Sequence, residues 1–385
     1  MADIAIYTLT SELHDELAVA AATREFLASI AQAYDFRGSD FSDYGTHALD
    51  LIYVRTGGTE GAFLHLLPSL RALSRRPFRL LTSGKSNSLA ASMEILSYLR
   101  SQGFEGEILH GSTTYINTRV GVLAQAESAR RRLTGLRLGV IGQPSDWLIS
   151  SAVDAVVVRQ RLGIELIQLP IDELIAAVGD LSGRPAREGA EAIYDALHGM
   201  VSRHHLNGFT LRCFDLLTTV HNTGCLALAR LNAEGIVAGC EGDVPALLTM
   251  AVTKALAGVS GFQANPARID VEAGELLFAH CTIPLNMVER YETDTHFESG
   301  IGVGIRGFMR PGDVTVFKLA PDLSRHFVAE GQLLRSQAEP DLCRTQQVIR
   351  LDDPLAARYF LSNPIGNHHI IIPGRWRAVI ESLLN

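Results

Sequence analysis

The feature that most constrains the fold of this chain is a regular alternation of short apolar runs and longer amphipathic runs over residues 4–256. Segments such as Ile4–Thr8 and Asp50–Arg55 have the length and apolar content of buried strands. Each precedes a longer run in which apolar residues recur every three or four positions. Strands that alternate with helices of this length form parallel sheets through right-handed crossovers. The alternation therefore predicts an α/β fold.

We expect two such α/β domains. The chain has 385 residues, and a single hydrophobic core rarely grows beyond about 250–300 residues. A helical run that finishes in Arg130–Arg132 is followed by a new strand at Leu136–Ile141 and by a helix expected over Asp146–Leu162. These signals predict Rossmann-like (flavodoxin-like) α/β domains over residues 1–134 and 135–262.

The pattern changes after Ser260. Short alternating segments are separated there by Pro-Gly and Asp-Pro turns, which is typical of an antiparallel or barrel-like unit. We expect a β-rich α+β domain, barrel-like in character, over residues 263–385. Its expected strands are Leu276–Ala279, Gly302–Ile305, Val314–Leu319, His326–Gln332 and Thr345–Leu351.

Candidate metal ligands stand at the ends of predicted strands. Glu241 and Asp243 follow an apolar strand at the point where open α/β sheets place their ligand sites. A later strand delivers His280, and the C-terminal apolar run begins with His368 and His369. Because neighbours on a strand face opposite sides, only one of these two adjacent histidines points at a shared site. Carboxylate and imidazole ligands together suit a divalent metal.

Other polar residues on predicted loops are candidates for substrate binding. Arg212 follows the strand that precedes Glu241's strand, so both are expected at the same edge of one sheet. His296 lies on a polar loop that leads to the glycine-rich segment around Arg306, where glycine density allows close approach of a ligand. Together with Arg55 and Lys85, the two arginines also suit an anionic substrate, since guanidinium groups bind oxyanions in a bidentate manner.

Composition excludes several classes of partner. The net charge of −8 argues against nucleic acid, which requires a basic face. No long apolar run or leader-like N-terminus is visible, so we expect neither membrane insertion nor secretion. The five cysteines show no CxxC spacing, which favours free thiols in a reducing cytoplasm. We therefore expect a cytoplasmic protein.

The residues quoted above carry a resemblance to a known family. Glu241–Asp243 with its following helix, Phe278–Cys281 with Pro284, and Asn367–His369 resemble the metal-site segments of the L-fucose isomerase and L-arabinose isomerase family. The resemblance covers Leu211–Asn385 best and is only architectural before that. Members of this family interconvert aldoses and ketoses.

The resemblance implies roles for individual residues. Glu241 matches a metal ligand that also transfers protons, His368 matches the C-terminal ligand, and His280 matches a histidine that arabinose isomerases use. Asn265 stands where the family has a second carboxylate, and its side-chain oxygen is a further candidate ligand. Asp243, Asp270 and Glu298 remain alternatives for the missing charge, with Asp243 as the second candidate catalytic residue. The expected substrate contacts are Arg212, His296, Arg306, Asn367 and His369.

The function implied by the resemblance is a metal-dependent aldose–ketose isomerase that works through an enediolate. The expected cofactor is Mn²⁺, with Co²⁺ and Zn²⁺ as alternatives. The expected substrate is a monosaccharide, either a fucose-like deoxy sugar or a sugar modified at C6 and anionic, such as sulfoquinovose. The family also implies a homo-oligomer, a trimer or hexamer with shared active sites. Two other classes fit the residues: a cytoplasmic sugar-binding protein, and a metal-dependent aldolase or epimerase.

Overall fold

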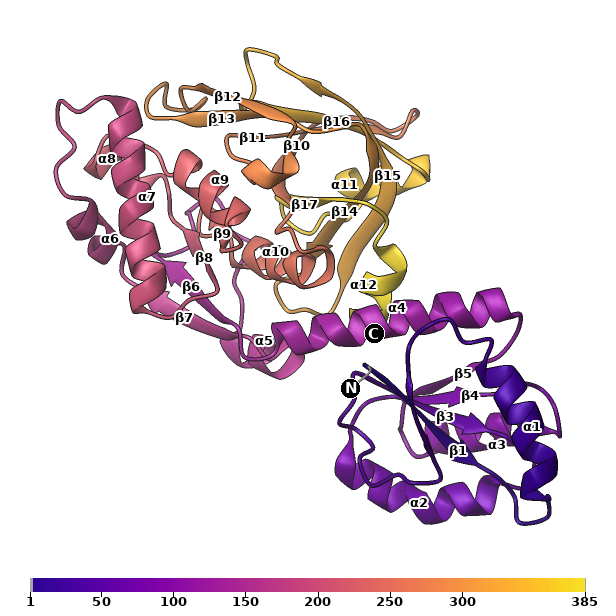
Figure 1. Cartoon of the computed structure of the whole chain (residues 1–385). Coiled ribbons are helices and arrows are strands. Elements are labelled where there is room, and N and C mark those ends of the chain that lie inside the picture. The colour runs from indigo at the N-terminus through magenta and orange to yellow at the C-terminus, as the bar shows by residue number, and fades with distance from the viewer. Residues whose placement is uncertain (1–2, 385) are drawn as a thin grey trace. The chain divides into compact units, whose positions relative to one another are not determined.

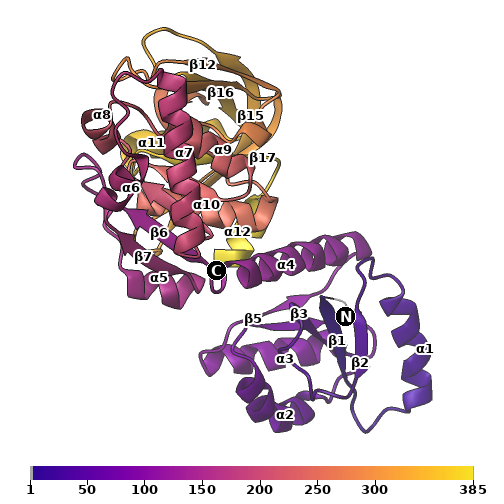
Figure 2. The ribbon, with the colours of Figure 1, turned by 60° about the vertical axis from the view of Figure 1, so that its left-hand side comes forward.

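The structure is a computed structural model that describes residues 3–384. The chain divides into two compact units, one made of residues 3–131 together with 381–384 and the other of residues 132–380. Each unit contains a parallel sheet, and the second also contains a closed barrel. Figures 1 and 2 show these elements in two views.

The first unit is built on a five-stranded parallel sheet of order β2-β1-β3-β4-β5. Apolar residues cover both faces of this sheet, because every residue of β1 and β3 is buried. Phe63 and Ile95 belong to the core on one face, and Leu27 and Val120 belong to the core on the other. The strands are β1 (Ile4–Leu9), β2 (Asp35–Gly38), β3 (Leu49–Val54), β4 (Phe78–Leu81) and β5 (Gly106–Leu109). The helices are α1 (Glu16–Leu27), α2 (Glu60–Leu73), α3 (Ser88–Ser101) and most of α4 (Thr113–Leu133). The helix α12 (Arg377–Leu384) is divided between the two units after residue 380.

The second unit begins with a four-stranded parallel sheet of order β7-β6-β8-β9. Its strands are β6 (Arg137–Ile141), β7 (Glu165–Leu169), β8 (Gly208–Leu211) and β9 (Val237–Cys240). Its helices are α5 (Ala155–Leu162), α6 (Ile171–Val178), α7 (Ala186–Arg203), α8 (Asp215–Thr219), α9 (Cys225–Ala233) and α10 (Val244–Ala257). Since all four strands run the same way, their carboxyl ends share one edge.

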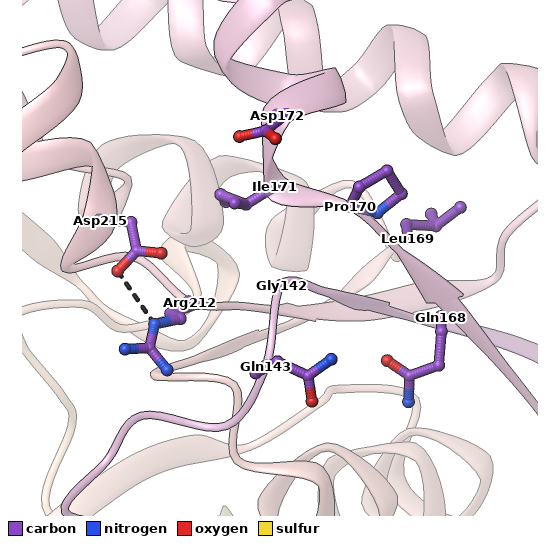
Figure 3. Close-up of a pocket in the computed structure, with 9 residues that line it drawn as sticks. All are labelled: Gly142, Gln143, Gln168, Leu169, Pro170, Ile171, Asp172, Arg212 and Asp215. Atoms are coloured by element: carbon purple, nitrogen blue, oxygen red, sulfur yellow. Dashed lines mark hydrogen bonds and ion pairs between the residues drawn. The ribbon is translucent and has the colours of Figure 1, made fainter.

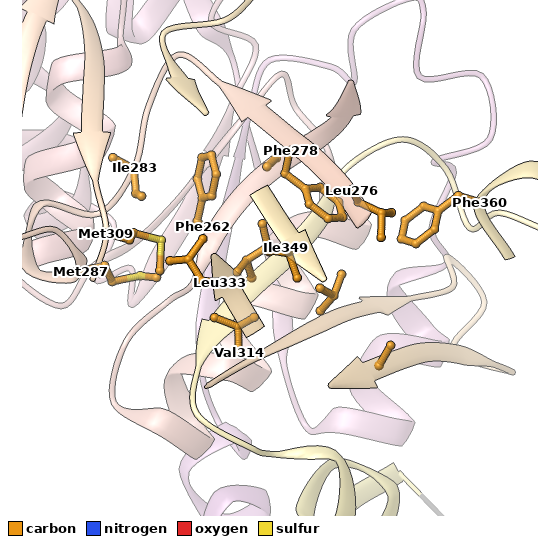
Figure 4. Close-up of a cluster of buried hydrophobic side chains, with 14 of the residues drawn as sticks. Phe262, Leu276, Phe278, Ile283, Met287, Met309, Val314, Leu333, Ile349 and Phe360 are labelled. Carbon is orange, nitrogen blue, oxygen red and sulfur yellow. The ribbon is translucent and has the colours of Figure 1, made fainter. Parts of the chain in front are cut away.

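A closed antiparallel barrel follows, in the order β10-β11-β16-β15-β14-β17. Its strands are β10 (Phe262–Asp270), β11 (Glu275–His280), β14 (Gly312–Leu319), β15 (His326–Gln337), β16 (Thr345–Leu351) and β17 (His369–Pro373). A separate hairpin pairs β12 (Arg290–Asp294) with β13 (Gly304–Phe308), and short helical turns form η1 (Leu285–Met287), η2 (Pro354–Arg358) and α11 (Tyr359–Ser362). The buried cluster of the barrel is drawn in Figure 4 and includes Phe262, Leu276, Phe278, Ile349 and Phe360.

Helix α10 connects the parallel sheet to the barrel. It packs against β8 and β9 on the sheet and against β14 and β17 of the barrel. Nearly every side chain of this helix is buried, because it lies between two apolar surfaces rather than on the outside of one. The residues just before α10 are therefore held at the meeting point of sheet and barrel.

Several elements differ from expectation. The helix expected over Asp146–Leu162 is wrong at its start: α5 begins at Ala155, where the Asp154 side chain accepts a hydrogen bond from the Val156 N–H as an N-cap. Residues 142–154 form an irregular loop instead. The strand β10 is not among the expected strands, and its Pro266 lies at a register shift with β11.

The strands expected at Val314–Leu319, His326–Gln332 and Thr345–Leu351 are confirmed as β14, β15 and β16. The expected boundary at residue 262 coincides with the first residue of β10, inside the second compact unit. The division into three domains and the Rossmann-like class remain predictions.

Candidate metal centre

Three chain segments bring Glu241, His280 and His368 together. Glu241 directly follows β9, His280 is the last residue of β11, and His368 directly precedes β17. Glu241 Oε1 lies 3.6 Å from His280 Nε2 and 3.5 Å from His368 Nε2. All three residues are buried, and their ligand atoms lie within 4.8 Å of one another. This is the carboxylate-and-imidazole group expected from the sequence.

Strand register explains why the two histidines meet. β10 pairs with β17 and with β11, so these three strands lie side by side in the barrel wall. Asn265 pairs with Ala279, the residue before His280, and Ala264 pairs with His369, the residue after His368. The register therefore places both imidazoles at one end of the barrel, next to the carboxyl edge of the parallel sheet.

The backbone at Glu241 adopts a left-handed conformation, with φ of +65°, and Gly242 follows with φ of +68°. A non-glycine residue in this region carries strain that its surroundings must offset. The loop after β6 supplies part of this support, because the Ser145 N–H donates to the Glu241 carbonyl at 3.0 Å. A side chain at Gly242 would place its Cβ 2.7 Å from the Gln143 carbonyl oxygen, so glycine is required there.

The hydrogen bonds of the histidines test whether a metal fits this group. Both ring nitrogens of His280 and Nε2 of His368 are buried without a hydrogen-bond partner. Unpaired buried polar atoms are costly, and a divalent cation bound between the two Nε2 atoms and Glu241 would satisfy both of those nitrogens. One carboxylate with two imidazoles suits Mn²⁺, Co²⁺ or Zn²⁺ better than Mg²⁺ or Ca²⁺. The residues present therefore fit a metal of this kind.

A buried ion pair of Asp243 and Lys318 lies next to His368. Its Nδ1 lies 2.8 Å from Asp243 Oδ2, and the Lys318 ammonium lies 3.5 Å from the same oxygen. Asp243 also caps α10, because its Oδ1 accepts from the Ala246 N–H at 2.8 Å. A carboxylate behind a ligating histidine fixes the ring so that the other nitrogen faces the metal. Asp243 therefore contacts the ring nitrogen of His368 that does not face Glu241.

Charges around the site shift several pKa values. Burial alone would raise the pKa of Glu241, but the positive charge of His368 beside it lowers the pKa well below the ordinary range. Burial likewise opposes ionisation of Asp243, and the Lys318 charge outweighs it, so that the pKa of Asp243 falls to about 2. Burial lowers the pKa of His280. Both carboxylates are thus ionised at neutral pH.

A pocket of about 390 Å³ opens beside this centre. It is lined by Trp147, Phe214, Cys225, Cys240, Glu241, Asn265, His280, Cys281, His296, Glu298, Cys343 and Asn367. Four of the five cysteines contribute to this lining, and all five are free thiols. Its dimensions and its mixture of polar and aromatic side chains suit a small polar ligand.

Two of the expected substrate contacts, Asn367 and His296, line this pocket, and so does the candidate metal ligand Asn265. Asn265 and Asn367 line it and are joined by a hydrogen bond of 3.0 Å from Nδ2 of Asn367 to Oδ1 of Asn265. His296 also lines it, with its ring edge-on to Phe214. Burial lowers the pKa of His296 to about 4, so this ring is neutral at pH 7.

Three other expected contacts lie elsewhere. His369 is buried on the opposite side of its strand from His368, where it packs on Phe360 and contacts Tyr359, as strand alternation requires. The Arg306 guanidinium is paired with Asp294 of the β12–β13 hairpin. Arg212 lines a neighbouring open pocket of about 540 Å³ and is paired there with Asp215 (Figure 3).

Acidic residues line the candidate site. Among the residues that the structure describes, those lining the 390 Å³ pocket include two carboxylates, Glu241 and Glu298, and no lysine or arginine. Arg212 is two positions from Phe214 in the pocket wall. Its guanidinium is held by Asp146, by Asp215 and by the Pro144 carbonyl.

Sequence reasoning missed Trp147, Phe214 and Lys318. The sequence predicts Trp147 in the first part of the helix expected over Asp146–Leu162, and this part does not form. It gives no functional signal for Phe214 or Lys318. The pair Asp154–Ala155 was the available signal for Trp147, since an N-cap there leaves a long loop ahead of it. No comparable signal exists for Lys318, because its partner Asp243 is 75 positions away in the chain.

The length and apolar content of a helix decide whether it could span a membrane. Among residues 3–384, no helix is both long enough and apolar enough to cross a bilayer.

The fold and the site together define a mixed α/β protein with a candidate divalent-metal centre. No family model matches the chain. It is similar to a sulfoquinovose isomerase of Alkalicoccus urumqiensis, with 22% identity over 278 residues, which cover 64% of this chain and 63% of the relative. A sulfoquinovose isomerase of Priestia megaterium is 22% identical over 64% of this chain and 62% of its own length. One of Clostridium sp. is 26% identical over 45% of this chain and 41% of its own length. The matches thus span less than two thirds of each relative.

Proposed function

We propose that this chain is a metal-dependent aldose–ketose isomerase. The observation that carries the proposal is the buried group of Glu241, His280 and His368 beside a pocket sized for a monosaccharide. The similarity to proteins named sulfoquinovose isomerase supports the same reaction class. We also propose that the reaction requires a metal, that this metal is Mn²⁺, and that the reaction passes through an enediolate.

Glu241 is the residue we assign to proton transfer between C2 and C1 of the sugar. It is a carboxylate that lines the pocket, and a carboxylate in reach of the substrate can accept a proton and return it. A metal bound by Glu241, His280 and His368 would act as a Lewis acid on the sugar oxygens. The neutral His296 and the amides of Asn265 and Asn367 orient the sugar hydroxyls from the pocket wall.

Glu298 is our candidate for the second acid–base group. Asn265 cannot exchange protons at ordinary pH, and Asp243 is buried behind His368. Asp270 accepts backbone hydrogen bonds in the β10–β11 turn, where its Oδ1 receives the N–H groups of Glu272 and Ala273. Glu298 alone of the three carboxylates considered lines the pocket.

The substrate we propose is sulfoquinovose, a sugar with an anionic sulfonate at C6. The pocket lining contributes negative charge, so the sulfonate needs a cation from the adjoining loops. We assign Arg212 to this role, because its partner Asp146 has a side chain that is 86% exposed and therefore easily displaced. A guanidinium binds a sulfonate in the same bidentate manner as a carboxylate.

The test is incubation of the metal-loaded protein with sulfoquinovose in D₂O, followed by NMR. We expect a ketose product with deuterium incorporated at the carbon that gains a proton. Glucose, which lacks the sulfonate, is the matched control and should react poorly. Arg212→Gln should raise the KM for sulfoquinovose much more than the KM for glucose, which has no sulfonate.

The products of this incubation also distinguish an isomerase from the rival functions. A sugar-binding protein exchanges no C–H proton, an aldolase cleaves a carbon–carbon bond, and an epimerase returns an aldose. Glu241→Gln should abolish turnover. Glu298→Gln should lower it by about 10²–10⁴-fold, whereas Glu289→Gln, at an exposed residue paired with Arg310, should not. Full activity in Glu241→Gln would refute the proposed isomerase mechanism.

A further inference from the structure

The two carboxylate oxygens of Glu241 have different neighbours. Oε1 faces Nε2 of His280 and Nε2 of His368, at 3.6 and 3.5 Å. Oε2 accepts a hydrogen bond of 2.7 Å from the indole N–H of Trp147. The indole therefore fixes the rotation of the carboxylate about its terminal bond, which is otherwise a soft torsion.

The loop that carries Trp147 is anchored on both sides of this contact. The Ser145 N–H donates to the Glu241 carbonyl, and the Arg212 guanidinium donates to the Pro144 carbonyl at 2.8 Å. Leu148, the residue after Trp147, is buried. Although residues 142–154 lack a helix or strand, the part next to Glu241 is thus tied to the residues that follow β8 and β9.

The Trp147 ring also forms one wall of the pocket. It meets the Phe214 ring edge-on at 4.8 Å between centroids, and Phe214 in turn meets His296 at 5.6 Å. The indole is nevertheless 50% exposed. A large aromatic side chain that is half exposed and donates its N–H to a candidate catalytic carboxylate is placed for function rather than for core packing.

We infer that Trp147 is a positioning residue that assigns different tasks to the two oxygens of Glu241. Oε1 is the oxygen that would ligate a divalent metal together with the two histidines. Oε2, held by the indole, is the oxygen that takes the proton from the sugar. The assignment of Oε2 rests on the proposed isomerase function, whereas the contact between Trp147 and a metal-ligating Glu241 does not.

The spectroscopic test uses the fact that the chain has two tryptophans. Trp376 donates its indole N–H to the Pro373 carbonyl and does not line the pocket. Trp376→Phe therefore leaves Trp147 as the single reporter and should retain parental activity. Titration of the metal-free Trp376→Phe protein with Mn²⁺ should give a saturable change in its fluorescence. The same titration of Trp376→Phe/Glu241→Ala should give none.

The kinetic test is Trp147→Phe, which keeps an aromatic wall and removes the N–H. We expect kcat to fall by about 10- to 100-fold, as for other groups that orient a metal ligand, with KM changed by less than about threefold. Calorimetric affinity for Mn²⁺ should fall far less than in Glu241→Ala, because Oε1 and both imidazoles remain.

Failure of the inference about Trp147 and failure of the proposed isomerase function give different results. A Trp376→Phe protein that binds Mn²⁺ by calorimetry without any fluorescence change would overturn the contact, whatever the enzyme does. Unchanged kcat in a folded, metal-binding Trp147→Phe protein would overturn the positioning role. Absence of isomerase activity on every sugar, combined with the expected fluorescence change, would refute the isomerase function and the role of Oε2 while leaving the contact with Glu241 standing.

Discussion

At the scale of single residues, Asp243 serves three neighbours at once. It caps α10, accepts from His368 Nδ1 and neutralises Lys318, and all of this occurs in a fully buried position. Removing one partner of a buried ion pair leaves the other charge uncompensated. The Asp243 side chain therefore contributes both to the stability of the fold and to the proposed metal binding. Variants can separate these two contributions.

We predict that Asp243→Asn weakens Mn²⁺ binding by about 10- to 100-fold, because the carboxylate behind His368 is lost. Asparagine still caps the helix. The metal-free variant should also lose about 3–5 kcal/mol of stability, since Lys318 is left buried without a counter-charge. Isothermal calorimetry with Mn²⁺ and urea unfolding measure the two effects.

The double variant Lys318→Met/Asp243→Asn is the control. It removes both charges, so most of the stability should return while the metal affinity stays low. If the double variant recovered full affinity, the loss in the single variant would reflect destabilisation, and the orienting role of Asp243 would be wrong.

At the scale of secondary-structure elements, α7 offers a test of how the helical layer packs on the second sheet. Gly199 and Gly189 both lie inside this helix. A Cβ at Gly199 would meet nothing within 4 Å, whereas a Cβ at Gly189 would lie 2.2 Å from the Asn222 side chain. Asn222 is held in place by a hydrogen bond to the Ala186 carbonyl.

We predict opposite effects of alanine at these two positions. Gly199→Ala should stabilise the protein by about 0.5–1 kcal/mol, because alanine loses less backbone freedom in a helix. Gly189→Ala should destabilise it by about 1–3 kcal/mol through overpacking. Urea unfolding followed by circular dichroism measures both. Equal effects of the two substitutions would mean that α7 does not pack on Asn222 as described.

The loop at residues 142–154 shows where element prediction failed. Its apolar residues, among them Leu148, Ile149 and Val153, have a spacing compatible with a helix that runs on to Leu162. Local hydrogen bonding decided otherwise, because Asp154 caps α5 and the Ser145 N–H bonds to the Glu241 carbonyl, far away in sequence. Such a long-range bond is invisible to periodicity.

At the scale of the whole molecule, the metal centre belongs to one compact unit. Glu241, His280 and His368 all lie within residues 132–380. A ligand that binds only the folded state stabilises the unit that contains its site. The trimer or hexamer that the family resemblance implies remains a prediction, which light scattering would test.

We predict that chelation of the metal destabilises the unit of residues 132–380 selectively. At a metal concentration about 100 times Kd, the stabilisation lost is about 2.7 kcal/mol. Hydrogen exchange followed by mass spectrometry should show faster exchange around Glu241 and in β11 and β17 after chelation. Peptides from residues 3–131 should be unchanged. Equal changes in both units would contradict a site confined to the second.

Elements whose signal is local could be predicted from the amino-acid sequence. Strand and helix alternation predicted parallel strands such as β1 and β3, and Pro-Gly and Asp-Pro turns predicted β14, β15 and β16, because hydrophobic periodicity and turn chemistry act over a few residues. Strand-end positions also singled out Glu241, His280 and His368. Alternation along a strand predicted that His368 and His369 face opposite ways.

The packing of strands and helices in three dimensions determines which of these residues meet. The register of β10 with β11 and β17 brings the histidines to one barrel end, and the closed barrel with α10 places Lys318 against Asp243. The same packing places Trp147 on Glu241 and leaves Arg306 on a separate hairpin. These are contacts between residues far apart in the chain. Their free energy comes from the packing of whole elements, which no short stretch of sequence contains.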